Sequence, residues 1–123
     1  MYIETVSFGI ESDTTYPYNE TISHPEYSFP CLYSRERAVA ITSGYFRIRT
    51  TNETQIANVL AQVGPISAAM NGAVPSFWYY YEGVYNDLSC TPGRSHSVLI
   101  VGYGTDYDEN GEPLPYWICK NSW

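Results

Sequence analysis

The sequence predicts an α+β fold, in which one short helix accompanies a small antiparallel sheet. Three observations support this class. Apolar residues recur at helical spacing from 56 to 63, between an Asn and a Gly-Pro pair. Residues 96–104 (HSVLIVGYG) are almost continuously apolar, as in a strand covered on both faces. Residues 116–122 (YWICKNS) predict a second strand beyond a polar loop.

Length and composition limit the class of protein. A chain of 123 residues has the size of one domain or part of one, and 44% hydrophobic against 15% charged residues predicts a globular chain. Six Lys and Arg oppose thirteen Asp and Glu, which gives a net charge of −7. Nucleic acid and anionic membranes are therefore poor partners. No apolar run approaches the roughly 20 residues that span a bilayer, and residues 1–9 lack the pattern of a signal peptide.

The predicted elements follow one another along the chain. Residues 14–31 are rich in Pro, Asn, Ser, Thr and Tyr, which predicts an extended, turn-rich segment. The chain divides near residue 40. Residues 43–50 (SGYFRIRT) alternate in the period-two pattern of a half-buried strand. The polar loop at 106–115 carries an Asn-Gly turn signal between the last two strands.

The predicted helix has recognisable ends. Asn52 is a candidate N-cap, and Gln55 lies three residues further on. Gly64 and Pro65 predict the end of the helix. The apolar face comprises Ile56, Val59, Leu60 and Val63. We therefore expect a helix between residues 52 and 64.

The last two strands bring two polar side chains together if they pair antiparallel. A register with Gly102 opposite Pro115 places His96 opposite Asn121. Directly opposed residues have Cβ atoms about 5 Å apart, so an imidazole N–H reaches an amide oxygen. Such an amide orients the ring and leaves its other nitrogen for a nucleophile. A structural histidine with a satisfied hydrogen bond is the alternative.

Four motifs resemble those of papain-like cysteine peptidases, the cathepsin group included. Residues 16–18 (YPY), 64–70 (GPISAAM), 96–104 and 116–123 (YWICKNSW) occur in that family's order and approximate spacing. The resemblance covers nearly the whole chain and corresponds to the C-terminal half of the family. It implies an incomplete papain-like fold. Residues 41–123 would form the right-hand antiparallel β-barrel domain without its last strand, and residues 1–40 a remnant of the left-hand domain with the interdomain segment.

The resemblance also implies roles for three residues. His96 looks like the general base that pairs with a cysteine thiolate, and Asn121 looks like the residue that orients it. Trp123 would shield the His–Asn hydrogen bond from water. An imidazolium lowers the pKa of the thiol, so that the nucleophile is present near neutral pH, and the same ring then protonates the leaving amine.

The reactive cysteine itself has no match in the sequence. In the family it lies in an upstream segment that also supplies an oxyanion-stabilising Gln, whereas Gln55 and Gln62 here belong to the predicted helix. By resemblance, Cys31 and Cys90 look like half-cystines whose partners lie outside these residues. We therefore expect a fragment that is inactive alone and whose partner is the N-terminal half of the same enzyme.

Residues around His96 depart from the family pattern. The family usually has Asp or Asn before the histidine and Ala or Gly after it, where this chain has Ser95 and Ser97. Both hydroxyls would alter the floor of the binding cleft. By resemblance, Ala69 and Ser97 would line the pocket for the substrate residue two before the scissile bond. Arg94 is either at the rim of that pocket or a solvated loop residue, which we favour.

Other chemistries have weaker support. Cys119 shares a strand face with Asn121 and is a conceivable displaced nucleophile, but a buried thiol that packs as a small hydrophobe is favoured. A zinc site from Cys90, His96 and Cys119 lacks the usual ligand spacing. The aromatic run 77–81 predicts packing rather than a ligand platform. Alternating Asp106, Asp108, Asn110 and Glu112 do not complete a calcium-loop pattern. We expect no metal and no cofactor.

The sequence thus favours a fragment of a cysteine-type peptidase that hydrolyses peptide bonds in peptide or protein substrates. The alternative is a non-catalytic homologue or truncated gene product that acts, if at all, as a binding protein. Asn19 and Asn52 each begin an Asn-Glu-Thr glycosylation triplet, which weakly supports a secretory route. By resemblance, the full-length parent would be lysosomal or secreted.

Overall fold

The computed structural model describes residues 9–19 and 30–123, which separate into two compact units, Met1–Arg47 and Ile48–Trp123. The units divide after Arg47, and their correspondence to the domains predicted on either side of residue 40 stays a prediction. Across the described residues, none of the helices has the length and apolar character required to cross a membrane.

The first unit is built on a two-stranded ladder. Strand β1 (Ile10–Glu11) pairs antiparallel with β2 (Ala38–Ala40), which directly follows the 3-10 turn η1 (Arg35–Arg37). Gly9 precedes β1 with a φ of 83°, and a Cβ there would lie 2.7 Å from the carbonyl oxygen of Ala40. Only glycine allows this close approach. Residues 14–19, 30 and 31 form no helix or strand, as predicted for a turn-rich segment, and residues 20–29 of that segment lie outside the described residues.

Helix α3 (Glu53–Val63) opens the second unit as the sequence predicts. The Asn52 side chain accepts a hydrogen bond of 3.3 Å from the Gln55 amide, and so satisfies one of the free N–H groups of the first turn. The helix ends at Gly64, whose φ of 118° is unfavourable for other residues. Leu60 faces inward and is 8% exposed. The predicted cap and stop signal are confirmed, and the apolar face is confirmed except at Val63, which is 65% exposed.

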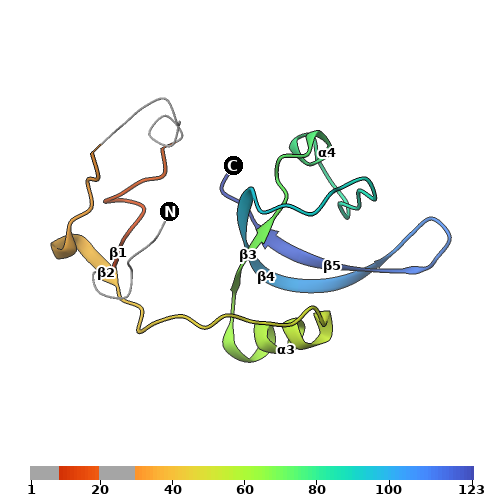
Figure 1. The fold of residues 1–123 in the computed structure, drawn as a ribbon, viewed down its shortest axis with the longest axis horizontal. Coiled ribbons are helices and arrows are strands. Elements are labelled where there is room, and N and C mark those ends of the chain that lie inside the picture. The colour runs from red at the N-terminus through yellow and green to blue at the C-terminus, as the bar shows by residue number, and fades with distance from the viewer. Residues whose placement is uncertain (1–8, 20–29) are drawn as a thin grey trace. The chain divides into compact units, whose positions relative to one another are not determined.

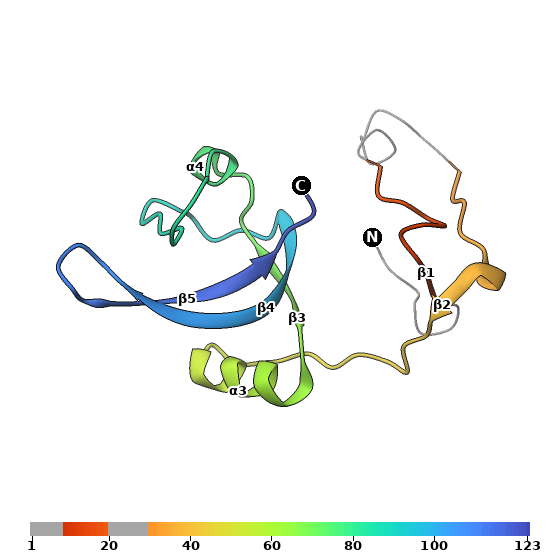
Figure 2. The same cartoon turned by 180° about the vertical axis from the view of Figure 1, so that it is seen from behind.

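Three antiparallel strands form the sheet of this unit, in the order β3-β4-β5. They are β3 (Ile66–Met70), β4 (His96–Tyr107) and β5 (Pro113–Lys120), and the short helix α4 (Pro75–Trp78) lies in the connection from β3 to β4. Figures 1 and 2 show α3 and α4 on opposite sides of the β4–β5 hairpin. Val98 of β4 is 7% exposed and, with Leu60, is the buried apolar core of the described residues.

The hairpin forms as predicted, but its predicted register is wrong. Gly102 pairs with Ile118, not with Pro115, and His96 pairs with Met70 on β3. The turn closes between Tyr107 and Pro113, which shifts the pairing by three residues from the predicted register. A bulge then reduces the shift to two residues near the site, because Ile100 pairs with Cys119 and Gly102 with Ile118, so Val101 is an extra residue on β4. Alternation of apolar and polar residues does not reveal such an insertion.

The predicted strand at residues 43–50 does not form. These residues have no regular structure, and the side chain of Tyr45 is 87% exposed. A strand needs a neighbour for its backbone hydrogen bonds, and no strand within the described parts of the chain pairs with this segment. The polar loop is also shorter than predicted, because β4 extends to Tyr107 and β5 begins at Pro113.

Candidate active site

His96 and Asn121 form a direct hydrogen bond in the second unit. The distance between His96 Nε2 and Asn121 Oδ1 is 2.9 Å. His96 is the first residue of β4, and Asn121 follows the last residue of β5. The ladder ends at Leu99 and Lys120, so one more step would set Asn121 opposite Val98, two residues from His96 on the same face. The predicted meeting therefore occurs, across a diagonal of the sheet.

The amide of Asn121 is oriented by the residues that follow it. Its Oδ1 also accepts hydrogen bonds from the backbone N–H of Ser122 at 2.8 Å and of Trp123 at 3.4 Å. A backbone N–H is always a donor, so the atom that it meets is the amide oxygen. That oxygen accepts from Nε2–H of the neutral imidazole. His96 Nδ1 is then the nitrogen that carries the lone pair.

Two aromatic rings pack against the imidazole. The Trp123 ring lies 4.1 Å from the His96 ring between centroids, and Phe77 of α4 contacts Trp123 edge-on at 5.4 Å. Trp123 thus lies against one side of the imidazole, while 59% of its own surface stays exposed. Phe77 is missed by sequence reasoning because it lies within residues 77–81, which are all aromatic. Phe77 is the first residue of that run and lies two residues after Pro75, which begins α4. This position is the signal in the sequence that distinguishes Phe77 from the other four aromatic residues.

The two serines beside His96 have different environments. The Ser95 hydroxyl accepts a hydrogen bond of 3.1 Å from the Gly72 amide, so it is engaged with the loop after β3. Ser97 pairs with Ala69 across β3 and β4, and both residues are exposed. Successive strand residues point to opposite faces, so Ala69 and Ser97 lie on the face opposite His96. Of the three residues predicted to bind substrate, the sheet thus brings these two together and turns Ser95 elsewhere.

A shallow hollow of about 330 Å³ lies beside these exposed residues. Its wall includes Ser67, Ser97 and Leu99 from β3 and β4, and Asn121 and Ser122 from the end of β5. Arg94 is exposed, in keeping with the favoured interpretation as a loop residue. The hollow therefore connects the expected substrate wall with the residue that orients the imidazole.

The three cysteines are free and exposed. Partial burial raises the pKa of the Cys119 thiol, which lowers the fraction of reactive thiolate at neutral pH. The prediction of a buried Cys119 is wrong, because β5 is the last strand of the sheet among the described residues and no further strand pairs with it. Cys31 and Cys90 belong to different units, and their role as half-cystines stays a prediction.

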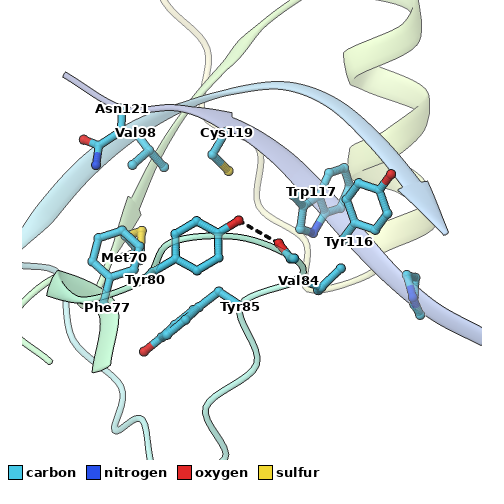
Figure 3. Close-up of a pocket in the computed structure, with 12 residues that line it drawn as sticks. Met70, Phe77, Tyr80, Val84, Tyr85, Val98, Tyr116, Trp117, Cys119 and Asn121 are labelled. Carbon is cyan, nitrogen blue, oxygen red and sulfur yellow. Dashed lines mark hydrogen bonds between the residues drawn. The ribbon is translucent and has the colours of Figure 1, made fainter. Parts of the chain in front are cut away.

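Cys119 and Asn121 line a second, larger pocket of about 370 Å³ on the His96 face. Figure 3 shows the Cys119 sulfur directed into it, above the side chains of Met70, Tyr80 and Tyr85. The Tyr80 hydroxyl donates to the Gly83 carbonyl at 2.6 Å. Phe77 and Tyr80 of the aromatic run thus form walls of this pocket, whereas Tyr79 and Tyr81 are 83% and 89% exposed.

The alternative cation sites lack support in the structure. Within the described residues, no group of three or more His, Cys, Asp and Glu side chains is placed to hold a metal ion. The Asp108 carboxylate accepts the amides of Asn110 and Glu112 at 2.8 and 2.9 Å, and these backbone bonds lower its pKa. Asp108 therefore organises the tight end of the hairpin.

The chain matches known proteins along its whole length. A family model described as papain family cysteine protease matches residues 1–123. Procathepsin L of Felis catus is 40% identical over 116 residues, which are 94% of this chain and 32% of that protein. Cathepsin S of Mus musculus is 36% identical over 115 residues, 94% of this chain and 31% of that protein.

A solved structure gives the same result. The digestive procathepsin L 3 of Tenebrio molitor larval midgut matches with a TM-score of 0.76 at 32% identity, over 96% of this chain and 35% of that one. The chain thus spans about a third of the length of its relatives. The family resemblance and the incomplete α+β fold predicted from the sequence are confirmed.

Proposed function

Because this chain belongs to the papain family of cysteine proteases, we propose that it supplies the base and the orienting amide of a peptidase active site. The observation that carries the proposal is the 2.9 Å hydrogen bond between His96 Nε2 and Asn121 Oδ1, beside Trp123. A histidine with one nitrogen fixed by an amide oxygen presents its other nitrogen in one orientation. This is the arrangement that a thiol nucleophile requires.

In this mechanism, His96 Nδ1 takes the proton of a cysteine thiol and the resulting imidazolium stabilises the thiolate. The thiolate attacks the carbonyl carbon of a peptide bond, and the imidazolium then gives its proton to the leaving amine. Water next hydrolyses the acyl-enzyme, with the imidazole again acting as base. Asn121 holds the ring orientation through these steps, and Trp123 removes water from one side of the pair, which strengthens its electrostatics.

The nucleophile in this proposal comes from outside these 123 residues. Cys119 is a poor candidate, because partial burial raises its pKa whereas a catalytic thiol needs a lowered one. The chain alone is therefore inactive, and activity belongs to the full-length parent, in which the N-terminal half is its partner.

Substrates of that parent are peptides or proteins. Ala69 and Ser97 form part of the wall that contacts the substrate: the two residues pair across β3 and β4, and Ser97 lines the exposed hollow that also includes Asn121. A lysosomal or secreted location fits a protein of this family that carries two glycosylation triplets.

Kinetics of the full-length parent test the proposal. We expect His96→Ala to lower kcat/KM for a fluorogenic peptide by about 10²- to 10⁴-fold, and Asn121→Ala to lower it by less. Asn110→Ala, in the distant hairpin loop, is the matched control and retains activity. Full activity of His96→Ala would overturn the proposal.

The isolated chain provides a second test. It should neither cleave peptides nor react with a thiol-directed inhibitor in a His96-dependent way. Labelling of Cys119 that disappears in His96→Ala would place the nucleophile within this chain instead. A parent that lacks a reactive cysteine and cleaves no peptide would establish the non-catalytic homologue.

A further inference from the structure

We propose that Trp78 is a positioning residue for His96 and acts through the backbone of Gly72. This inference rests on the proposed role of His96 as the base. The indole N–H of Trp78 donates a hydrogen bond of 2.6 Å to the carbonyl oxygen of Gly72. Trp78 is the last residue of α4, so this bond fastens the helix to the loop that follows β3.

Gly72 is in direct contact with His96. A Cβ on Gly72 would lie 2.5 Å from the Cβ of His96 and 3.0 Å from its Cγ. No side chain therefore separates the Gly72 backbone from the base of the imidazole. A shift of this backbone changes the space available to the ring directly.

Further hydrogen bonds hold the same loop from the side of β4. The Gly72 amide donates to the Ser95 hydroxyl at 3.1 Å. The Asn71 amide group donates to the Thr91 carbonyl at 2.8 Å. The loop is thus fastened on one side to the residues before His96, and by Trp78 to α4 on the other. Among the bonds described here, only that of Trp78 comes from α4.

The environment of Trp78 points to this hydrogen bond rather than to packing. The residue is 57% exposed, so burial of a large ring does not explain its location. The preceding residue, Phe77, packs on both His96 and Trp123, at 6.2 and 5.4 Å between ring centroids. Two consecutive residues of α4 therefore act on the imidazole. Phe77 contacts the ring directly, and Trp78 holds the Gly72 backbone that lies against it.

Loss of the Trp78 hydrogen bond should free the loop and loosen the imidazole. The ring would then hold its Nε2–H bond to Asn121 for a smaller fraction of the time. Misplacement of a catalytic group by about 1 Å costs up to about 100-fold in rate, and a loosened ring should cost on the order of tenfold. The loss should fall on kcat with KM little changed, because Trp78 does not line the hollow beside Ala69 and Ser97.

The test compares Trp78→Phe with Trp117→Phe in the full-length parent labelled with ¹⁵N-histidine. Phe keeps an aromatic ring and removes the N–H. Trp117 is the matched control, because its ring contacts Tyr103 at 6.1 Å on the hairpin. The His96 signal is the one that disappears in His96→Ala. We expect Trp78→Phe alone to shift it from the Nε2–H tautomer toward a mixture, with about a tenfold lower kcat.

Asn121→Ala separates the two proposals. An unchanged His96 spectrum and kcat in Trp78→Phe, with a changed spectrum in Asn121→Ala, would overturn the role of Trp78 and keep the base. An unchanged spectrum in both variants would contradict the His96–Asn121 pairing itself. Should Trp78→Phe fail to fold, replacing the Trp78 indole with benzothiophene keeps its volume without the N–H and gives the same two outcomes.

Discussion

The two compact units hold their strands by different physical means. Among the described residues of the first unit, the buried side chain is a carboxylate: Glu11 accepts the Ser34 amide at 2.6 Å and pairs with Arg37 at 2.7 Å, and its side chain is 1% exposed. In the second unit, the buried side chains are the apolar Leu60 of α3 and Val98 of β4, the central one of three hydrogen-bonded strands. The stability of the first unit should therefore depend on the charge of Glu11, and that of the second unit on the volume of its buried apolar side chains.

This difference matters for the candidate site, which lies wholly in the second unit. The His96–Asn121 pair depends on the backbone ladder and on the packing of aromatic rings. The strands of the first unit instead lie beside an ion pair between Glu11 and Arg37. The following substitutions and pH changes test this difference between the two units, from the largest expected effect to the smallest.

Leu60→Ala should destabilise the second unit by about 2 kcal/mol, because it removes buried methyl groups and leaves a cavity. Leu60 faces the sheet from α3 and is 8% exposed. Val63→Ala, on the same helix at 65% exposure, should change stability by less than about 0.5 kcal/mol. Hydrogen exchange of the β4 amides measures both. Equal effects of the two substitutions would mean that α3 is not anchored through Leu60.

Acid should open the first unit selectively. The hydrogen bond from Arg37, with that from the Ser34 amide, holds the pKa of Glu11 below its usual value. A carboxylate with a lowered folded-state pKa stabilises the fold above its unfolded pKa and loses that contribution as the pH falls through the folded value. We therefore expect exchange at the Ser34 amide to accelerate below about pH 4.3, the usual pKa of glutamate, while β4 amides stay protected.

Two substitutions on neighbouring elements check the origin of this acid response. Glu11→Gln cannot ionise, so its Ser34 amide should exchange quickly at neutral pH and show no further acid step. Glu36→Gln, an exposed neighbour of Arg37, should keep the response of the parent chain. An acid step that survives in Glu11→Gln would assign it to another group.

Asn52→Ala should have the smallest effect, a local loss of about 1 kcal/mol at the start of α3. The substitution removes the side-chain oxygen that accepts the Gln55 amide. Asn52→Ser keeps an oxygen acceptor and should restore most of the protection of that amide. Equal exchange in both variants would show that the cap contributes nothing to the helix.

Local signals in the sequence predict local structure well. The N-cap at Asn52, the stop at Gly64 and the apolar run of β4 all depend on residues within a few positions of each other. The pairing of His96 with Asn121 also follows from the sequence, although through a wrong register. The two side chains still meet because the predicted and observed registers near the site differ by two residues. A shift of two residues leaves each side chain on the same face of the sheet.

Features that depend on distant partners are not predicted. Residues 43–50 have the alternation of a strand, but alternation does not supply the neighbouring strand that one needs. The contacts of Phe77 and Trp78 with the site depend on where α4 folds back along the chain. In a run of five aromatic residues, the sequence pattern does not indicate which side chains face the imidazole and which face water. The structure distinguishes them.

The extra residue at Val101 divides the hairpin into two sections that vary separately. On one side of it, Leu99 pairs with Lys120 and fixes which face His96 and Asn121 share. On the other, Tyr107 pairs with Pro113 next to the turn. A change in the length of the turn should therefore leave the hydrogen bond between His96 and Asn121 in place, because the turn lies on the other side of Val101 from both residues.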